Sequence, residues 1–207
     1  MSEVSSLTRL AIQIERTQVP WGCAIYRTTY SSFSDTHFDQ VVELITVMVE
    51  DNVHRWEGLH TNNDDETRGA KAVLLENYRP IVMNNKSQFD GMSMKDIRAY
   101  HGSFIGTPVG ERPYTSDFFC ILIDEEVMHV LAGANQISLL ATEDRVDDGR
   151  EYWVKTIDTD LEDEEDEYGR GWMKCSIYSL WSLCLAMDGH LPMKSFAALY
   201  PDGPYEG

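Results

Sequence analysis

The chain has 207 residues, of which 43% are apolar, and a formal net charge of −18. This length and composition suit one soluble domain with a sizeable core. So acidic a chain repels phosphate backbones and anionic lipid, so we expect neither nucleic acid nor a membrane as a partner. The four cysteines are scattered and form no CxxC pair. This favours buried, reduced thiols in a cytoplasmic protein over disulfides or a zinc site.

The first elements surround an aromatic stretch near the amino end. Residues 7–19 fit both a helical stripe and strand alternation, and we favour the helix. Residues 21–30 are rich in aromatic and β-branched side chains, which predicts a central strand. Ser34 or Asp35 can then cap a helix over about 35–56, with its apolar face on the sheet.

The rest of the chain alternates between strand-like and helix-like runs. Residues 70–75 are ambiguous, and Pro80 indicates that the strand around it lies at an edge or a bulge. The run 158–168 reads as an acidic loop, and 189–207 as a loose tail. The other expected elements are strands at 78–83, 118–123 and 152–157, helices at about 93–105 and 172–187, and a short helix capped by Asp124.

These elements predict a single α+β domain over residues 1–207. We expect three to five strands covered by helices on one main face. A ferredoxin-like sandwich is the first choice of fold, and a small three-layer α/β arrangement is the second.

Four stretches carry a resemblance to a known group of proteins. They are the Trp21–Tyr30 segment WGCAIYRTTY, FDGMS at 89–93 with Ile97-Arg98, IDEE at 123–126 and GWMK at 171–174. Together they resemble a large group of uncharacterised proteins of filamentous fungi, in the usual order and over most of the chain. The resemblance implies an intracellular fungal protein encoded beside secondary-metabolism genes. That group has no settled activity, so the resemblance implies no chemistry.

Arg27 is the most suggestive single residue for function. In an extended strand it shares a face with Trp21, Cys23 and Ile25, while Ala24, Tyr26, Thr28 and Tyr30 point to the other face. A guanidinium that follows apolar neighbours must find a carboxylate or leave the core. One interpretation is a salt bridge near the strand end, to an acid such as Asp124 or Glu125. The other is a clamp for an anion or a carbonyl group in a pocket.

Other residues could complete such a pocket. His101, or Asp124 after a buried strand, could move a proton, although capping the next helix is the plainer role for Asp124. Tyr26, Tyr30 and Arg98 would line the ligand. Glu126 and His129 have a metal-like spacing that occurs only once, and the acidic run lacks the glycine and final glutamate of a calcium loop. We therefore expect no metal and no cofactor.

Two functions from different classes fit these observations. The first is a non-catalytic binding or interaction domain, which explains the absence of nucleotide-binding and hydrolase motifs and predicts a partner with a basic surface. The second is a cofactor-independent cyclase, isomerase or dehydratase that acts on an apolar fungal metabolite. A closed apolar pocket lined by Arg27 and by His101 or Asp124 would favour the enzyme.

Overall fold

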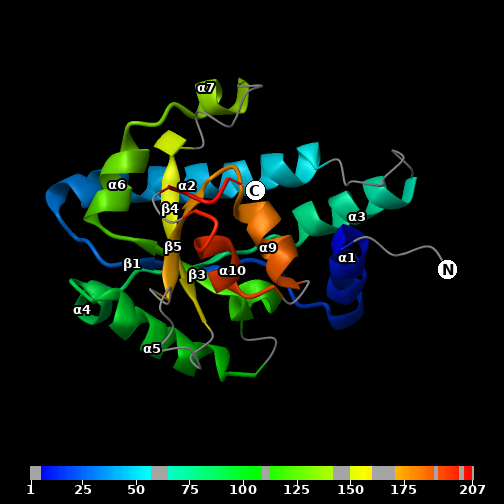
Figure 1. Cartoon of the computed structure of the whole chain (residues 1–207), viewed down its shortest axis with the longest axis horizontal. Coiled ribbons are helices and arrows are strands. Elements are labelled where there is room, and N and C mark those ends of the chain that lie inside the picture. The colour runs from blue at the N-terminus through cyan, green and yellow to red at the C-terminus, as the bar shows by residue number, and fades with distance from the viewer. Residues whose placement is uncertain are drawn as a thin grey trace.

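A mixed five-stranded sheet forms the centre of the molecule, and helices lie on both of its faces (Figure 1). This computed structural model describes residues 6–56, 65–108, 112–141, 150–159, 171–188, 191–200 and 203–206. The strand order is β2-β1-β3-β4-β5. β1 runs parallel to both β2 and β3, whereas β4 runs antiparallel to β3 and β5. The strands are β1 (Ala24–Arg27), β2 (Ile81–Met83), β3 (Phe119–Ile123), β4 (Trp153–Asp158) and β5 (Trp172–Ser176).

The helices divide into a larger and a smaller layer. In Figure 1, α2 and α6 lie above the strands, and α4 and α5 lie below them. The larger layer contains α1 (Ser6–Thr17), α2 (Ser32–Arg55), α3 (Asp65–Glu76), α6 (Glu125–Ala132) and α9 (Leu180–Asp188). The smaller layer contains α4 (Lys86–Phe89) and α5 (Met94–Ile105). The short elements η1 (Tyr114–Asp117), α7 (Gln136–Ala141) and α10 (Met193–Ala197) complete the described helices.

β1 separates the two cores, as its alternation predicts. Ile25 belongs to the large core, whereas Ala24 and Tyr26 belong to the small core beside α5. Every residue of β1 and β3 is buried, because helices cover both faces of these central strands. The regular strand is shorter than the predicted 21–30 segment, although Trp21 forms a further parallel bridge to Tyr78.

The α+β class and the helix-covered sheet are confirmed, but two finer expectations are wrong. Helices cover both faces rather than one main face. The first-choice ferredoxin-like sandwich is also wrong, because β1 has a parallel neighbour on each side, whereas that fold splits its βαβ unit with a strand in between. The second choice, a three-layer arrangement, describes the layers that are present.

Helix boundaries follow local capping more closely than apolar spacing. The hydroxyl of Ser31 accepts a hydrogen bond from the backbone N–H of Ser34 and caps α2, so neither Ser34 nor Asp35 is the cap. Ser93 and Asp124 cap α5 and α6 as expected. The ambiguous segment 70–75 lies inside α3, and residues 7–17 are helical rather than extended.

The carboxyl-terminal third departs most from expectation. The helix predicted at 172–187 is instead β5 followed by α9. Met173 and Cys175 are buried while Trp172 and Lys174 are partly exposed, which is the period of a strand. In the tail, which we expected to be loose, α10 forms and Tyr205 pairs with Cys175. Of the acidic run 158–168, all but Asp158 and Thr159 lies outside the described residues.

Candidate functional site

Arg27 is held where β1 ends and α2 begins. Its Nε donates to the carbonyl of Thr29 at 2.8 Å, and its Nη2 donates to the hydroxyl of Ser34 at 3.0 Å. Nη2 also forms an ion pair with Asp35, whose side chain is 58% exposed, whereas that of Arg27 is 7% exposed. The salt bridge near the strand end is therefore present, but its carboxylate belongs to Asp35 rather than to Asp124 or Glu125.

Two aromatic rings enclose the same guanidinium. Its Cζ lies 4.3 Å from the ring centroid of Tyr30 and 4.6 Å from that of Phe38, distances at which a cation is attracted to a ring face. The hydroxyl of Tyr30 is buried without a hydrogen-bond partner among the described residues, and burial raises its pKa. These contacts hold Arg27 against the loop that follows β1 and the first turns of α2, so it ties β1 to α2.

Tyr26 and His101 form a buried hydrogen-bonded pair on the opposite face of β1. The Tyr26 hydroxyl lies 2.9 Å from Nδ1 of His101, whose Nε2 lies 2.9 Å from the carbonyl oxygen of Ser116. A carbonyl can only accept, so Nε2 carries the proton and Nδ1 accepts from Tyr26. Tyr26 is 0% exposed and His101 is 1% exposed. The pair is therefore closed off from solvent.

Burial sets the charge state of this pair. Loss of solvent lowers the pKa of His101, and the Ser116 carbonyl and Asp117 oppose that change only partly. Burial likewise raises the pKa of Tyr26, and Cys120 and Tyr100 add to that rise. Both side chains are thus neutral at pH 7, which matches the hydrogen-bond directions deduced from the carbonyl. The rings of Phe89 and Tyr100 pack edge-on against Tyr26.

Asp124 belongs to a third, separate group of charges. Its Oδ1 accepts from the backbone N–H of Val127 at 3.0 Å, and its Oδ2 accepts from Lys155 at 2.5 Å. Lys155 is buried in β4 and also pairs with Glu126 at 2.6 Å, and Glu126 in turn pairs with Lys174 at 3.3 Å. The sequence analysis missed Lys155, although a lysine inside the strand-like run 152–157 was a signal for a buried ion pair.

The sequence-predicted residues do not converge on one cavity. Arg27 faces the large core and Tyr26 the small core, because neighbouring residues of a strand point to opposite faces. Arg98 lies on α5 against Gly171, where an added Cβ would come within 2.7 Å of its Nη1. The structure therefore pairs Arg27 with Tyr30 and Tyr26 with His101, and it leaves Asp124 with Lys155.

One further contact joins the two loops that leave β1 and β3. Glu125, the first residue of α6, accepts a hydrogen bond from the hydroxyl of Thr29 and lies 3.3 Å from that of Ser31. Nε2 of His129 lies 3.4 Å from the same carboxylate. The His129 ring stacks on Phe33 of α2 with centroids 4.5 Å apart. Glu125 thus couples α6 to the start of α2.

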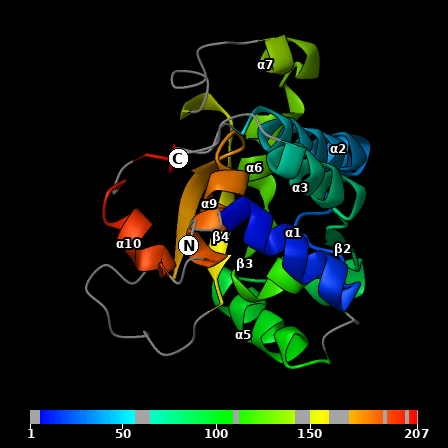
Figure 2. The ribbon, with the colours of Figure 1, turned by 90° about the vertical axis from the view of Figure 1, so that its right-hand side faces the viewer.

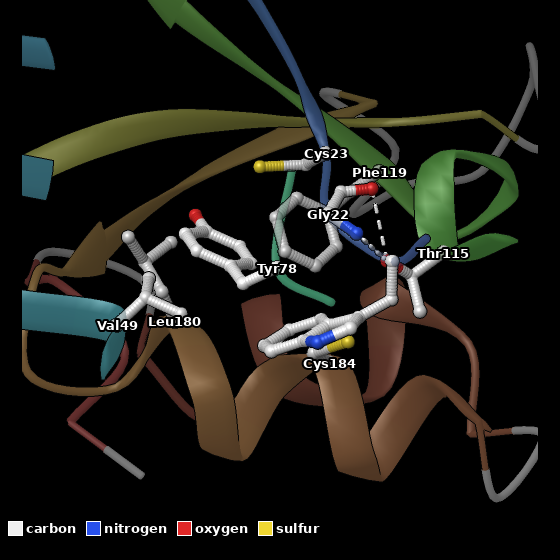
Figure 3. A pocket seen from close by; sticks show the side chains of 9 residues that line it. Gly22, Cys23, Val49, Tyr78, Thr115, Phe119, Leu180 and Cys184 are labelled. Carbon is white, nitrogen blue, oxygen red and sulfur yellow. Dashed lines mark hydrogen bonds between the residues drawn. The ribbon is translucent and has the colours of Figure 1, made fainter. Parts of the chain in front are cut away.

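A small cavity of about 20 Å³ lies elsewhere, between the amino ends of β1 and β3 and helix α9 (Figure 3). That volume holds about one water molecule, whereas metabolite pockets measure about 300 Å³ or more. The hydroxyl of Thr115 donates to the Gly22 carbonyl and accepts from the Gly22 N–H, each at 2.9 Å. The cavity is lined by Trp21, Gly22, Cys23, Val49, Tyr78, Thr115, Phe119, Leu180 and Cys184.

The polar groups beside this cavity are poorly suited to chemistry. The Tyr78 hydroxyl is buried without a hydrogen-bond partner among the described residues. Burial raises the pKa of the Cys23 thiol to about 12 and also raises that of Cys184. A thiol with so high a pKa is a weak nucleophile at neutral pH.

The search for metal ligands among the described residues and the comparisons with known proteins both gave no match. Within the described ranges, no three His, Cys, Asp or Glu side chains gather as metal ligands, and no helix is both long and apolar enough to cross a membrane. No protein-family model, curated protein or solved structure matches the chain.

Proposed function

We propose that the protein is a non-catalytic binding domain whose partner presents a basic surface. The observation that carries the proposal is the separation of the candidate residues. Arg27, His101 and Asp124 each have hydrogen-bond or ion-pair partners inside the fold, and they lie in three different places. The described cavity contains none of them.

Catalysis by these groups would require contact with a substrate. A general base must come within hydrogen-bond reach of the proton that it removes, but His101 is enclosed by Tyr26, Ser116 and the small core. A clamp for an oxyanion must present its donors to a ligand, but the Arg27 side chain is 7% exposed, and its Nε and Nη2 already bond to Thr29, Ser34 and Asp35. Ion pairing and packing account for both residues without a ligand.

Charge indicates the chemistry of the partner. The chain carries a net charge of −18, which accelerates encounter with a basic protein and slows encounter with an acidic one. On the outer face of α2, Asp35, Asp39 and Glu43 are exposed on successive turns, and Asp35 is the one of the three that pairs with Arg27. Glu125 lies beside the start of the same helix. We assign the basic partner to this face, which we call the α2 acidic face.

A charge-matched pair of variants tests the proposal. Asp39→Asn with Glu43→Gln removes two charges from the α2 acidic face, and Glu15→Gln with Glu66→Gln removes two exposed charges from α1 and α3. Proteins captured from the source cells by the wild type are identified, purified and bound again by calorimetry at 50 and 300 mM salt. We expect a basic partner whose affinity falls at least fivefold with the α2 pair and less than twofold with the control pair. Equal losses, or a partner without net positive charge, would refute the assignment.

A cofactor-independent cyclase, isomerase or dehydratase is the alternative, and one observation favours it. Burial raises the pKa of Tyr26 and lowers the pKa of His101, and groups with perturbed pKa values gather at active sites. The pair would need an opening between α5 and the sheet that admits an apolar metabolite. The binding domain remains our first proposal, because the described cavity lies on the far side of β1 from this pair.

The cellular setting is also a proposal. Cys23, Cys120, Cys175 and Cys184 are all buried free thiols, which agrees with a reducing compartment such as the cytoplasm. Fungal origin and a role beside secondary metabolism rest on the sequence resemblance alone. Localisation of a tagged chain in the source organism would test the first point, since a secreted pool would contradict it.

A further inference from the structure

The two edge strands of the sheet, β5 and β2, differ in whether a further segment pairs with them. At the β5 edge, the carboxyl-terminal segment adds to the sheet, because the Ser176 N–H donates to the Tyr205 carbonyl at 3.0 Å and the Tyr205 N–H donates to the Lys174 carbonyl at 2.9 Å. At the other edge, β2 pairs with β1 alone among the described residues. Figure 2 shows β2 at the margin of the molecule opposite β5. An open edge is a template for a further strand.

The backbone of β2 has one residue that faces fully outward. The Ile81 N–H donates to the Cys23 carbonyl at 3.1 Å, and Ile25 lies opposite Val82 in the parallel register. In a parallel ladder, alternate residues bond to the same neighbour. Ile81 and Met83 therefore bond to β1, and the N–H and C=O of Val82 point away from the sheet. Its side chain is 40% exposed.

Local charge around this edge opposes that of the rest of the chain. Residues 77–89 contain Arg79 and Lys86 and no carboxylate, within a chain of net charge −18. Both cationic residues are exposed, and the nearest acids along the chain are Glu76 and Asp90. At physiological salt, charges are screened over about 8 Å, so the charges that act on a ligand lying on β2 are those close to it, which include Arg79 and Lys86.

We propose that β2 binds an extended acidic peptide segment by strand addition, centred on Val82. The outward N–H and C=O of Val82 supply the main-chain hydrogen bonds, and Arg79 and Lys86 attract carboxylates at the two ends of the segment. A second copy of the chain fits less well, because an antiparallel β2–β2 pair brings four cations together and joins two chains of charge −18. This surface is distinct from the α2 acidic face, so the inference goes beyond the proposed function.

Nuclear magnetic resonance of the full-length ¹⁵N-labelled protein tests the proposal. The probe is a blocked heptapeptide with a Val-Thr-Val centre and two glutamates at each end. We expect shift changes confined to β2 and its flanks, and at least tenfold slower hydrogen exchange at the Val82 amide. The same peptide with lysines in place of glutamates should bind at least tenfold more weakly.

Two substitutions at one position provide the internal control. Val82→Pro removes the outward N–H and leaves the donors of Ile81 and Met83 to β1, because an edge strand tolerates proline where its N–H faces solvent. Val82→Thr keeps the N–H and the β-branched shape. We expect at least tenfold weaker binding of the glutamate peptide to the first variant and less than a twofold change for the second.

Several outcomes would overturn the inference. They are shift changes outside β2, equal binding of the acidic and basic peptides, an unchanged Val82 amide at saturating peptide, and concentration-dependent β2 shifts without peptide, which would indicate self-association. If Val82→Pro fails to fold, hydrogen exchange in the wild type still decides the question. None of these results depends on the α2 acidic face, so failure here leaves the proposed function to its own test.

Discussion

The hydrogen bond between Tyr26 and His101 should make a measurable contribution to stability. Replacement of Tyr26 by Phe removes the hydroxyl that donates to Nδ1 of His101 at 2.9 Å. Nδ1 is then a buried acceptor without a partner, because His101 is 1% exposed and its Nε2 is already engaged. The lost bond and the unpaired acceptor together cost about 1–3 kcal/mol. The ring itself stays, so packing against Phe89 is retained.

Urea unfolding followed by tryptophan fluorescence measures this loss, and Tyr100→Phe is the matched control. Tyr100 packs beside Tyr26 with ring centroids 6.0 Å apart, but it is half-buried and none of its described contacts is a hydrogen bond from the hydroxyl. We expect a lower midpoint at an unchanged slope for Tyr26→Phe, and a change of less than about 0.5 kcal/mol for Tyr100→Phe. Equal free energies of unfolding for the two variants would refute the hydrogen-bond assignment.

Three further predictions concern stability. Tyr78→Phe should be neutral or should stabilise the protein by about 1 kcal/mol in the same urea assay, because the Tyr78 hydroxyl is buried without a hydrogen-bond partner among the described residues. A loss of more than about 1 kcal/mol in the free energy of unfolding would show that the hydroxyl has a partner. Arg27→Lys should cost about 1–3 kcal/mol, because a lysine cannot bond to Ser34 and Thr29 together; Asp35→Asn, at an exposed carboxylate, should cost less than about 1 kcal/mol. Burial lowers the pKa of His101 from 6.5, so the unfolded state binds the proton first. The contribution of neutral His101 to the free energy of unfolding is therefore complete above pH 6.5. It is lost as the pH falls below that value, by up to about 1.4 kcal/mol per pH unit. His101→Gln should flatten this part of the stability profile between pH 7.5 and 5.5, and a variant with the wild-type slope would contradict the assignment.

The sequence predicted the central part of the fold well because its signals are local and redundant. The apolar run 118–123 is buried on both faces in β3, and the alternation along β1 assigns Ile25 and Tyr26 to opposite cores as expected. Ser93 and Asp124 have capping chemistry that depends only on the next few residues, and both caps are present.

The sequence failed where partners far along the chain decide the structure. Trp172–Ser176 carries enough apolar residues for a helix, and only its pairing with β4 makes it a strand. We expected Asp35 to cap a helix, but its carboxylate pairs with Arg27. Whether Asp35 or Glu125 becomes the partner of Arg27 depends on the path of loop 28–31, which the residue types do not reveal. One of the two partners of His101 is a backbone carbonyl 15 residues away, and residue types do not reveal a backbone acceptor.

The central claim is that the molecule acts through its surfaces and does not turn over a small molecule. The most direct test incubates purified full-length protein with a metabolite extract from source cells that lack it, followed by untargeted mass spectrometry before and after. The account predicts that no compound is consumed or formed beyond the amount of protein added. Conversion of any compound in many-fold excess over the protein, abolished by Tyr26→Phe in a folded sample, would contradict it.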